Sequence, residues 1–269
     1  MNQRKGGDWE RYTALVGMFV ATGYLLNDNP QSLLLVGEPG IGKSQLLSRF
    51  AKHPTITRVS DVTSDGLRHV VFPRMIKAGH KHLMLPEFHK LFQRRESTGE
   101  HTAGVLQSAL SGELHTAVIG KDEVQIGQPG WRIGMLGAMT TTVFANWQRN
   151  LGNSGFIDRL MVVPVSLAAE IQASIEYAIA SEDVSMTVEV SFSKLTAPTA
   201  VAIPKLLARS IQSLATAVFK NDPNRNRKVA TVRALTRGVA AMRGAKSILK
   251  RDVEQVGDVL SGVEIGAFK

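Results

Sequence analysis

The chain has 269 residues, of which 43% are hydrophobic, and a formal net charge of +9. This length suits one α/β domain with a smaller domain attached, and the hydrophobic share is large enough for a sizeable core. The absence of cysteine excludes disulfides and thiolate metal sites and suits a reducing compartment. The positive charge favours a polyanionic partner but does not identify one.

The sequence shows neither a membrane span nor a secretory signal. The longest apolar run near the N-terminus, residues 15–26, is interrupted by glycine and polar residues and is too short to cross a bilayer. No charged start leads into an apolar stretch with a small-residue cleavage site. We therefore expect a cytoplasmic protein of a bacterium, an archaeon or a virus-infected host cell, with no membrane partner.

The first predicted helix covers residues 10–26, with Leu15, Phe19 and Leu26 among its inner residues. Residues 27–30, Asn-Asp-Asn-Pro, predict a turn. This turn feeds the first predicted strand.

Residues 33–50, LLLVGEPGIGKSQLLSRF, carry the most specific signal in the chain. Four apolar residues predict a short buried strand at 33–36, and residues 45–50 predict a helix. Between them, residues 37–44 fit the pattern G-x-x-x-x-G-K-[ST] at every fixed position. Strand, glycine-rich loop and helix form the context that a phosphate-binding loop requires.

The residue types of this loop match the chemistry of a nucleoside triphosphate. Its glycines let backbone N–H groups point at phosphate oxygens, at a helix N-terminus that favours anions. Lys43 is predicted to reach the β- and γ-phosphates, and the Ser44 hydroxyl to ligate Mg²⁺. The alternative is a plain glycine-rich turn before a helix. The predicted ATP-binding residues are Gly37, Glu38, Pro39, Gly40, Ile41, Gly42, Lys43, Ser44 and Gln45.

Residues 55–60 predict a second strand, residues 66–78 a helix, and residues 83–85 a third, short strand. In phosphate-loop ATPases, an apolar strand beside the glycine loop normally ends in Asp-Glu. The Asp holds the magnesium shell, and the Glu polarises the attacking water. Glu87 is therefore the predicted general base, and Pro86 stands in place of the Asp, so weak turnover is expected. The alternative is a surface glutamate on a turn.

Histidines 80, 82 and 89 lie close to Glu87 in the sequence. His-x-His and Glu-x-His spacings occur in metal sites. No cysteine or further carboxylate completes a clear ligand set, so a zinc site is the less favoured interpretation.

Residues 114–126 predict a β-hairpin that follows a helix at 100–110. Its turn is Gly120-Lys121-Asp122, and Lys121 at the tip is predicted to contact a nucleic-acid backbone. A solvated lysine is the alternative, because lysine is common in exposed turns.

Residues 131–139 predict another buried strand, which is followed by three threonines. A polar residue at the end of a central strand next to the nucleotide strand can contact the γ-phosphate or the attacking water. Thr140 is the first candidate for this role and Thr141 the second. Alternatively, Thr140 is an ordinary cap for the following helix.

Residues 161–165 predict the last core strand, and Arg159 lies at its entrance. Arg159 has no evident use within its own chain, whereas an arginine finger from a neighbouring subunit completes a nucleotide site. We therefore expect a ring-shaped homo-oligomer. Alternatively, Arg159 pairs with Asp158 or Glu87.

The C-terminal third is predicted to be helical, with helices at 203–219, 229–249 and 252–260. These helices are expected to form a lid in which Arg233 reaches back to the phosphates, and a solvated helix face is the alternative for Arg233. The predicted division is an α/β nucleotide-binding core at 1–167, a linker at 168–200 and a helical lid at 201–269.

Taken together, these segments resemble the AAA+ module of MCM replicative helicases, in unbroken order from residue 10 to residue 262. The phosphate loop with its Ser-Gln-Leu-Leu tail is the most specific match. The others are short: residues 86–90 resemble Asp-Glu-Phe-Asp-Lys, 107–126 the helix and hairpin before sensor 1, 136–140 the sensor 1 strand, 157–160 the arginine-finger segment, 231–235 sensor 2 and 250–253 the lid.

The same parts also resemble MoxR chaperone ATPases and bacterial enhancer-binding activators, which share the hairpin before sensor 1. Two departures from the MCM pattern concern the site itself. Pro86 replaces the magnesium-shell Asp, and Thr140 replaces the sensor Asn.

The resemblance implies a P-loop AAA+ fold: an α/β core with a parallel sheet and an inserted β-hairpin, followed by an α-helical lid. It also implies an ATPase that uses ATP and Mg²⁺, forms a ring of six subunits and acts on single-stranded DNA as a helicase or translocase. Replication proteins are the expected further partners. The alternatives are a MoxR-like protein-remodelling ATPase or helicase loader, and a nucleotide-gated scaffold that hydrolyses slowly or not at all. The implied functional residues outside the loop are Glu87, Thr140, Arg159 and Arg233 for catalysis and Lys121 for DNA.

Overall fold

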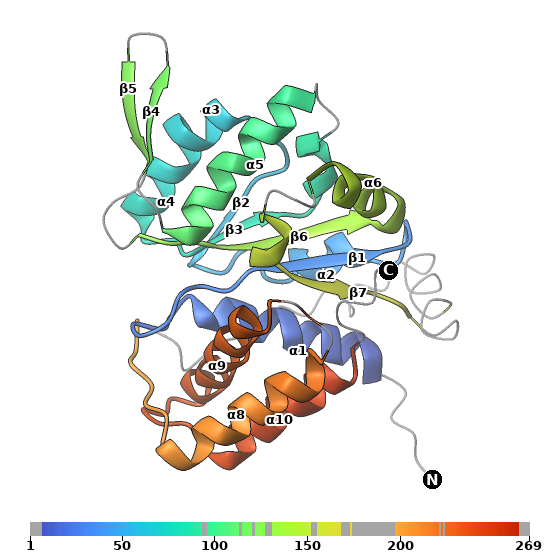
Figure 1. Ribbon diagram of the computed structural model, residues 1–269, viewed down its shortest axis with the longest axis vertical. Coiled ribbons are helices and arrows are strands. Elements are labelled where there is room, and N and C mark those ends of the chain that lie inside the picture. The colour runs from blue at the N-terminus through green and yellow to red at the C-terminus, as the bar shows by residue number, and fades with distance from the viewer. Residues whose placement is uncertain are drawn as a thin grey trace.

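A five-stranded, all-parallel β-sheet with helices on both faces forms the centre of the molecule (Figure 1). The strands follow the order β2-β3-β6-β1-β7, and a separate pair, β4 and β5, is antiparallel. The computed structural model describes residues 7–92, 96–112, 115–119, 122–126, 131–151, 155–167, 173, 197–220, 222 and 224–263. The predicted α/β class with a parallel sheet is therefore confirmed.

The elements follow the predicted order along the chain. The strands are β1 (Leu33–Gly37), β2 (Ile56–Arg58), β3 (His82–Leu85), β4 (His115–Ile119), β5 (Asp122–Ile126), β6 (Gly134–Thr140) and β7 (Met161–Pro164). The helices are α1 (Gly7–Thr22), α2 (Lys43–Ser48), α3 (Ser64–Gly66), α4 (Phe72–Ala78), α5 (Glu96–Ser111), α6 (Thr141–Leu151), α8 (Lys205–Val218), α9 (Arg225–Met242) and α10 (Lys250–Ser261). A π-helical turn, Leu67–Val71, joins α3 to α4, and 3-10 turns cover Phe88–Phe92 and Ile157–Arg159.

β1 lies inside the sheet, between β6 and β7, and all its residues are buried. Successive side chains of a strand point to opposite faces. Leu33 and Leu35 accordingly join one hydrophobic cluster, and Leu34 and Val36 join the other. A continuous apolar run is what a strand buried on both faces requires, which explains why the sequence revealed this strand so clearly.

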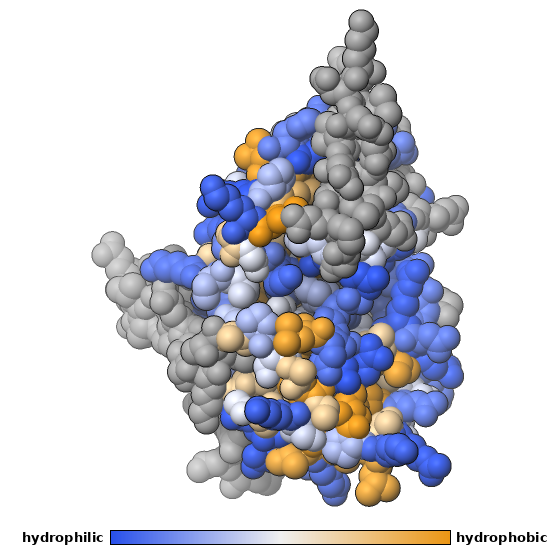
Figure 2. Space-filling view, turned by 90° about the vertical axis from the view of Figure 1, so that its left-hand side faces the viewer, coloured by the Kyte–Doolittle hydropathy of each residue, from blue (hydrophilic) through white to orange (hydrophobic). Residues whose placement is uncertain are grey.

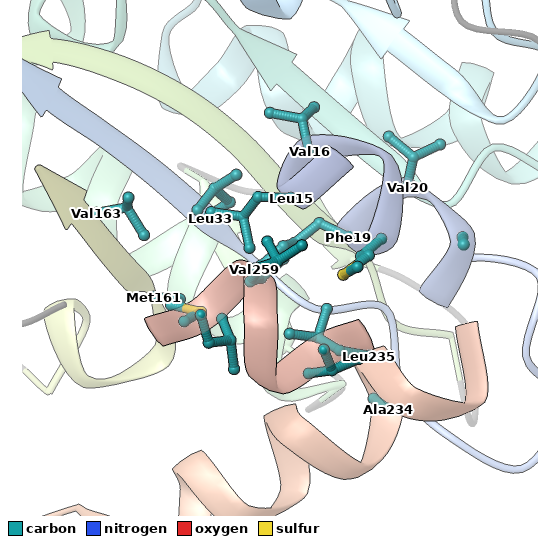
Figure 3. Close-up of a cluster of buried hydrophobic side chains, with 14 of the residues drawn as sticks. Leu15, Val16, Phe19, Val20, Leu33, Met161, Val163, Ala234, Leu235 and Val259 are labelled. Atoms are coloured by element: carbon teal, nitrogen blue, oxygen red, sulfur yellow. The ribbon is translucent and has the colours of Figure 1, made fainter. Parts of the chain in front are cut away.

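The first cluster joins the sheet to helices from both ends of the chain (Figure 3). Leu15 and Phe19 of α1 pack between Leu33 of β1 and the α9 and α10 side chains Leu235 and Val259. α1 therefore contacts α9 and α10, so the N-terminal helix lies with the C-terminal ones below the sheet in Figure 1. The division into core, linker and lid stays a prediction.

The second cluster covers the other face of the sheet and is rich in aromatic side chains. The rings of Phe88, Trp147 and Phe156 contact one another with centroids 5.5 to 6.2 Å apart. Ring pairs at this spacing add to the stabilisation from buried area. This cluster fixes the segment after β3 against α6 and the turn before β7.

The β4–β5 hairpin stands away from the main sheet (Figure 1). Its pairing runs from His115 opposite Ile126 to Ile119 opposite Asp122, which confirms the predicted hairpin. Lys121, the predicted DNA contact, lies outside the described residues.

Two details differ from the sequence-based predictions. Leu26 is 68% exposed, because α1 ends at Thr22 and the chain turns before reaching it, so its prediction as an inner residue is wrong. The helix predicted at 66–78 is interrupted by the π-turn, and Pro73 lies in the first turn of α4, where it costs no hydrogen bond. No helix within the described ranges has the length and apolar character that crossing a bilayer requires.

Candidate functional site

The glycine-rich loop connects the carboxyl end of β1 to α2, and its glycines are required for different reasons. A Cβ on Gly37 would lie 2.4 Å from the Val165 carbonyl oxygen, which no side chain tolerates. Gly40 and Gly42 adopt φ angles of +83° and +80°, a region that favours glycine. The space around a Cβ on Gly40 is open, so the outer side of the loop is accessible to a ligand.

Lys43 lies at the start of α2 with its side chain folded into the loop. Its Nζ donates hydrogen bonds to the carbonyl oxygens of Gly37 and Glu38, at 2.8 and 2.6 Å. An ammonium group has three N–H donors, so one remains for a phosphate oxygen. Burial lowers the pKa of Lys43 below its ordinary value, and the nearby Glu38 carboxylate offsets part of this shift.

Ser44 connects the loop to the end of β3. Its Oγ donates a hydrogen bond of 3.0 Å to the Pro86 carbonyl oxygen. β3 is not the direct neighbour of β1, because β6 lies between them, and this bond links the two segments directly across the edge of the sheet. The Ser44 hydroxyl and the Pro86 carbonyl are hard oxygen donors that suit Mg²⁺ when phosphate oxygens and water complete its shell.

Glu87 follows Pro86 and is about half exposed, with its side chain at 45%. Lys90, one helical turn further on, forms an ion pair with its Oε2. The hydrogen bond from Lys90 holds the pKa of Glu87 below its ordinary value. The carboxylate is therefore ionised at neutral pH, the state in which it accepts a hydrogen bond from water. Its role as the catalytic base stays a prediction.

Thr140 ends β6 and pairs in register with Gly37 of β1, so it lies next to the loop as predicted. Its Oγ1 also accepts a hydrogen bond of 3.4 Å from the Val143 amide, at the start of α6. Both interpretations of this residue, the site residue and the helix cap, thus agree with its position. Its contact with a phosphate or a water stays a prediction.

Trp9, in α1, packs against the loop, a contact that the sequence did not reveal. A Cβ on Gly42 would lie 2.9 Å from its indole ring. The Arg49 guanidinium lies 5.5 Å from a Trp9 ring centroid and donates a hydrogen bond to Thr13 Oγ1. α1 therefore fixes both the loop and the segment after α2. The local sequence around Trp9 does not indicate this contact, because β1 separates α1 from the loop along the chain.

Arg159 has hydrogen-bond partners within its own chain, contrary to the expectation on which the predicted ring rests. Its Nε donates to Ser111 Oγ at 2.7 Å and its NH1 to the Gly155 carbonyl at 2.6 Å. These bonds join the end of α5 to the turn before β7. Because Arg159 has partners within its own chain, a lack of partners no longer favours an arginine finger. That role stays a prediction.

Arg233 is not brought to the phosphate loop, which corrects its predicted position. It bonds Asp28 Oδ1 at 2.6 Å, and Arg237 bonds Asp28 Oδ2 at 2.6 Å. Asp28 precedes β1, whereas the loop follows it, and β1 is five residues or about 16 Å long. The physical reason is that a buried carboxylate at the amino end of β1 holds both arginines on α9.

The histidines near Glu87 have separate surroundings. His80 shares a hydrogen bond of 2.7 Å with Thr57, and His82 is fully buried between Gly23 and Gly134. Within the part of the chain that the structure describes, no group of three or more His, Asp or Glu side chains is placed to hold a metal ion.

The carboxyl edge of the sheet thus gathers the loop, Lys43, Ser44, Glu87 and Thr140, but not Arg233. This arrangement offers donors for phosphate oxygens and oxygen ligands for a divalent cation. No protein-family model and no curated protein sequence matches this chain.

Proposed function

We propose that this chain is an ATPase of the AAA+ class, similar to MCM helicases, that uses ATP and Mg²⁺ to act on DNA as a helicase or translocase. The observation that carries the proposal is the hydrogen bond between Ser44 and the Pro86 carbonyl. It joins the glycine-rich loop to the end of β3, where Glu87 follows. In a phosphate-loop ATPase these are the two segments that meet the nucleotide.

Each of these groups has a distinct task in the proposed reaction. The loop amides and the remaining Lys43 donor bind and orient the phosphates. Ser44 Oγ and the Pro86 carbonyl would hold Mg²⁺, which when bound neutralises charge on the phosphates. Ionised Glu87 accepts a hydrogen bond from the attacking water and orients it, provided that Lys90 shares or releases the carboxylate. Thr140 adds a hydroxyl at the same edge.

Pro86 favours a second candidate function, a nucleotide-gated scaffold with slow or no hydrolysis. At this position a neutral carbonyl oxygen takes the place of the carboxylate that holds the magnesium shell in related ATPases. A neutral ligand attracts a divalent cation less strongly than a carboxylate does. Binding of ATP is then expected to persist while turnover is weak.

Glu87→Gln tests the proposal, with Glu100→Gln, on the exposed face of α5, as the matched control. We expect Glu87→Gln to bind a fluorescent ATP analogue like the parent protein and to lose hydrolysis by at least about 100-fold. The control should hydrolyse at the parent rate. Equal hydrolysis by Glu87→Gln and the parent would place the base elsewhere.

Stimulation by DNA and the rate of the parent protein separate the candidates. A helicase or translocase should hydrolyse ATP faster with single-stranded DNA, whereas a MoxR-like remodelling ATPase should not. Binding without turnover, restored by Pro86→Asp, would favour the gated scaffold. The proposed ring of six subunits rests on the family resemblance, and sedimentation with an ATP analogue tests it.

A further inference from the structure

Nearly all of the net positive charge belongs to the C-terminal quarter of the sequence. Residues 201–269 contain 13 lysines and arginines and 5 acidic residues, a net charge of +8. Residues 1–200 contain 19 basic and 18 acidic residues, a net charge of +1. An acidic partner that responds to the net charge is therefore attracted mainly by this C-terminal part of the sequence.

Helices α8 and α10 start side by side and run in the same direction. Just before them, Ala202 forms a parallel bridge with Ser247, and the Ala202 amide donates to the Lys246 carbonyl at 2.8 Å. Further along, a Cβ on Gly257 of α10 would contact the Leu214 side chain of α8 at 3.4 Å. The first turns of the two helices therefore form one end of the helical unit.

Basic and apolar side chains are exposed together at this end. Leu206 is 88% exposed and Leu249 is 46% exposed. In the described chain, Lys250 pairs with Glu254, a contact of 3.3 Å in which both side chains are largely exposed, whereas Lys205 and Lys246 have no ion-pair partner. We call this surface the basic–leucine end; it consists of Lys205, Leu206, Lys246, Leu249, Lys250 and Arg251. Hydrophobic residues are exposed among hydrophilic ones over the lower half of the face in Figure 2, where the C-terminal helices lie.

The cations lie where the helices themselves disfavour them. A helix N-terminus carries a partial positive charge, so Lys205 in α8 and Lys250 and Arg251 in α10 are in an unfavourable position there. The buried Asp252 carboxylate caps the first turn of α10 by accepting a hydrogen bond from the Leu249 amide, and it also binds Arg243, so it does not pair with the exposed cations. Pro204, the residue before α8, provides no side-chain cap for this helix. An anionic ligand bound at this end would reduce the repulsion between these cations and the helix N-termini.

We propose that the basic–leucine end is a docking surface for an acidic segment of another protein that carries apolar side chains. The positive charge is complementary to acidic residues, and the exposed leucines match apolar ones.

Single-stranded nucleic acid suits this surface less well, because it binds by stacking on aromatic side chains. Among the described residues, none of the large hydrophobic side chains that are exposed is aromatic. The same end of a second copy is equally basic, so it does not complement this surface. This surface is separate from the nucleotide site, so the inference does not depend on the proposed function.

Fluorescence anisotropy with three labelled probes tests the inference. The probes are a helical peptide of about four turns built from Glu, Asp and Leu, the same peptide with Ser in place of Leu, and an oligothymidylate of similar charge. The variants are Lys205→Ala/Lys250→Ala and Leu206→Ser/Leu249→Ser. The matched control is Lys220→Ala/Arg227→Ala, two exposed cations at the α8–α9 turn, the other end of α8.

We expect the leucine-containing peptide to bind best and each of the two variants to weaken it by at least about tenfold. The control variant should bind this peptide with an affinity within about twofold of the parent. Helical circular dichroism at the parent level in all variants shows that they are folded. Equal losses in the control would reduce the effect to unspecific charge and overturn the inference. So would tighter binding of the oligothymidylate, or peptide binding that does not depend on the leucines.

Discussion

Cationic side chains lie at both ends of strand β1, but their partners differ. At the amino end, Arg233 and Arg237 both close on Asp28, whose side chain is only 2% exposed. At the carboxyl end, Lys43 and Ser44 bond to backbone carbonyl oxygens. Charge is thus neutralised within the chain at one end and left for a ligand at the other. A cation near a strand end therefore indicates a ligand site only where no carboxylate of the chain forms an ion pair with it.

The direction of the strands explains which end is available. In a parallel sheet each strand is followed by a helix whose first amide groups face the carboxyl edge. The amino edge instead receives the returning chain, and here α9 covers it. Lys228 of α9 also donates a hydrogen bond of 3.2 Å to the Leu160 carbonyl, just before β7. The amino edge is therefore expected to contribute stability and the carboxyl edge binding.

The largest effect is expected at the amino end, from Asp28→Ala. This change leaves two arginines without their buried carboxylate and should lower the free energy of unfolding by about 3 kcal/mol. Urea denaturation followed by circular dichroism measures it. The control is Asp65→Ala, whose exposed carboxylate lies 3.9 Å from Arg68 and should matter by less than about 1 kcal/mol. A loss at Asp28 no larger than at Asp65 would contradict the structural role of this end.

Lys43→Ala should have the largest effect at the carboxyl end. Removing the ammonium that we propose to bind the phosphates should weaken binding of a fluorescent ATP analogue by about 100-fold, or about 2.7 kcal/mol. Stability should change far less than in Asp28→Ala. Lys77→Ala, which changes an exposed lysine of α4, is the matched control and should bind like the parent. An unchanged affinity in Lys43→Ala would show that the loop does not bind phosphates.

The amino edge should also make stability depend on pH, through His82 at the start of β3. Burial lowers the pKa of His82 from 6.5 to about 3. Between these values the unfolded chain binds a proton that the folded chain does not, so stability falls as the pH drops below 6.5. The loss due to this residue should reach about 2 kcal/mol between pH 7 and pH 5.

The variant His82→Gln isolates this contribution. Its unfolding free energy, measured by urea denaturation at pH 7 and pH 5, should differ by about 2 kcal/mol less than in the parent. His101→Gln, which changes an exposed histidine of α5, should keep the parent difference. If His82→Gln and the parent lose equal stability on acidification, buried His82 is not the cause.

Arg233→Ala should have the smallest effect. Arg233 is 45% exposed, and Arg237 still holds Asp28 without it, so the loss of stability should be about 1 kcal/mol or less. Because Arg233 lies at the amino end, ATP binding and hydrolysis should stay within about twofold of the parent. A large loss of hydrolysis without a loss of stability would restore its predicted catalytic role, for instance in a neighbouring subunit's site.

Much of the fold could be predicted because its signals are local. The apolar run of β1, the loop that follows and the alternating strands of the hairpin appear in the structure within a few residues of their predicted positions. Gly40 and Gly42 are likewise explained by local backbone angles. Such features depend on neighbours in the sequence, and a pattern of residues therefore reports them.

The tertiary structure decided everything that depends on distant partners. The sequence predicted Arg233 at the phosphates, but Asp28, 205 residues away, holds it at the amino end of β1. The sequence likewise did not indicate that Arg159 donates a hydrogen bond to Ser111, 48 residues away. Trp9 covers Gly42 only because α1 packs between the sheet and α9. A long side chain binds whichever opposite charge or acceptor the packed chain brings near it, and no local pattern encodes which one that is.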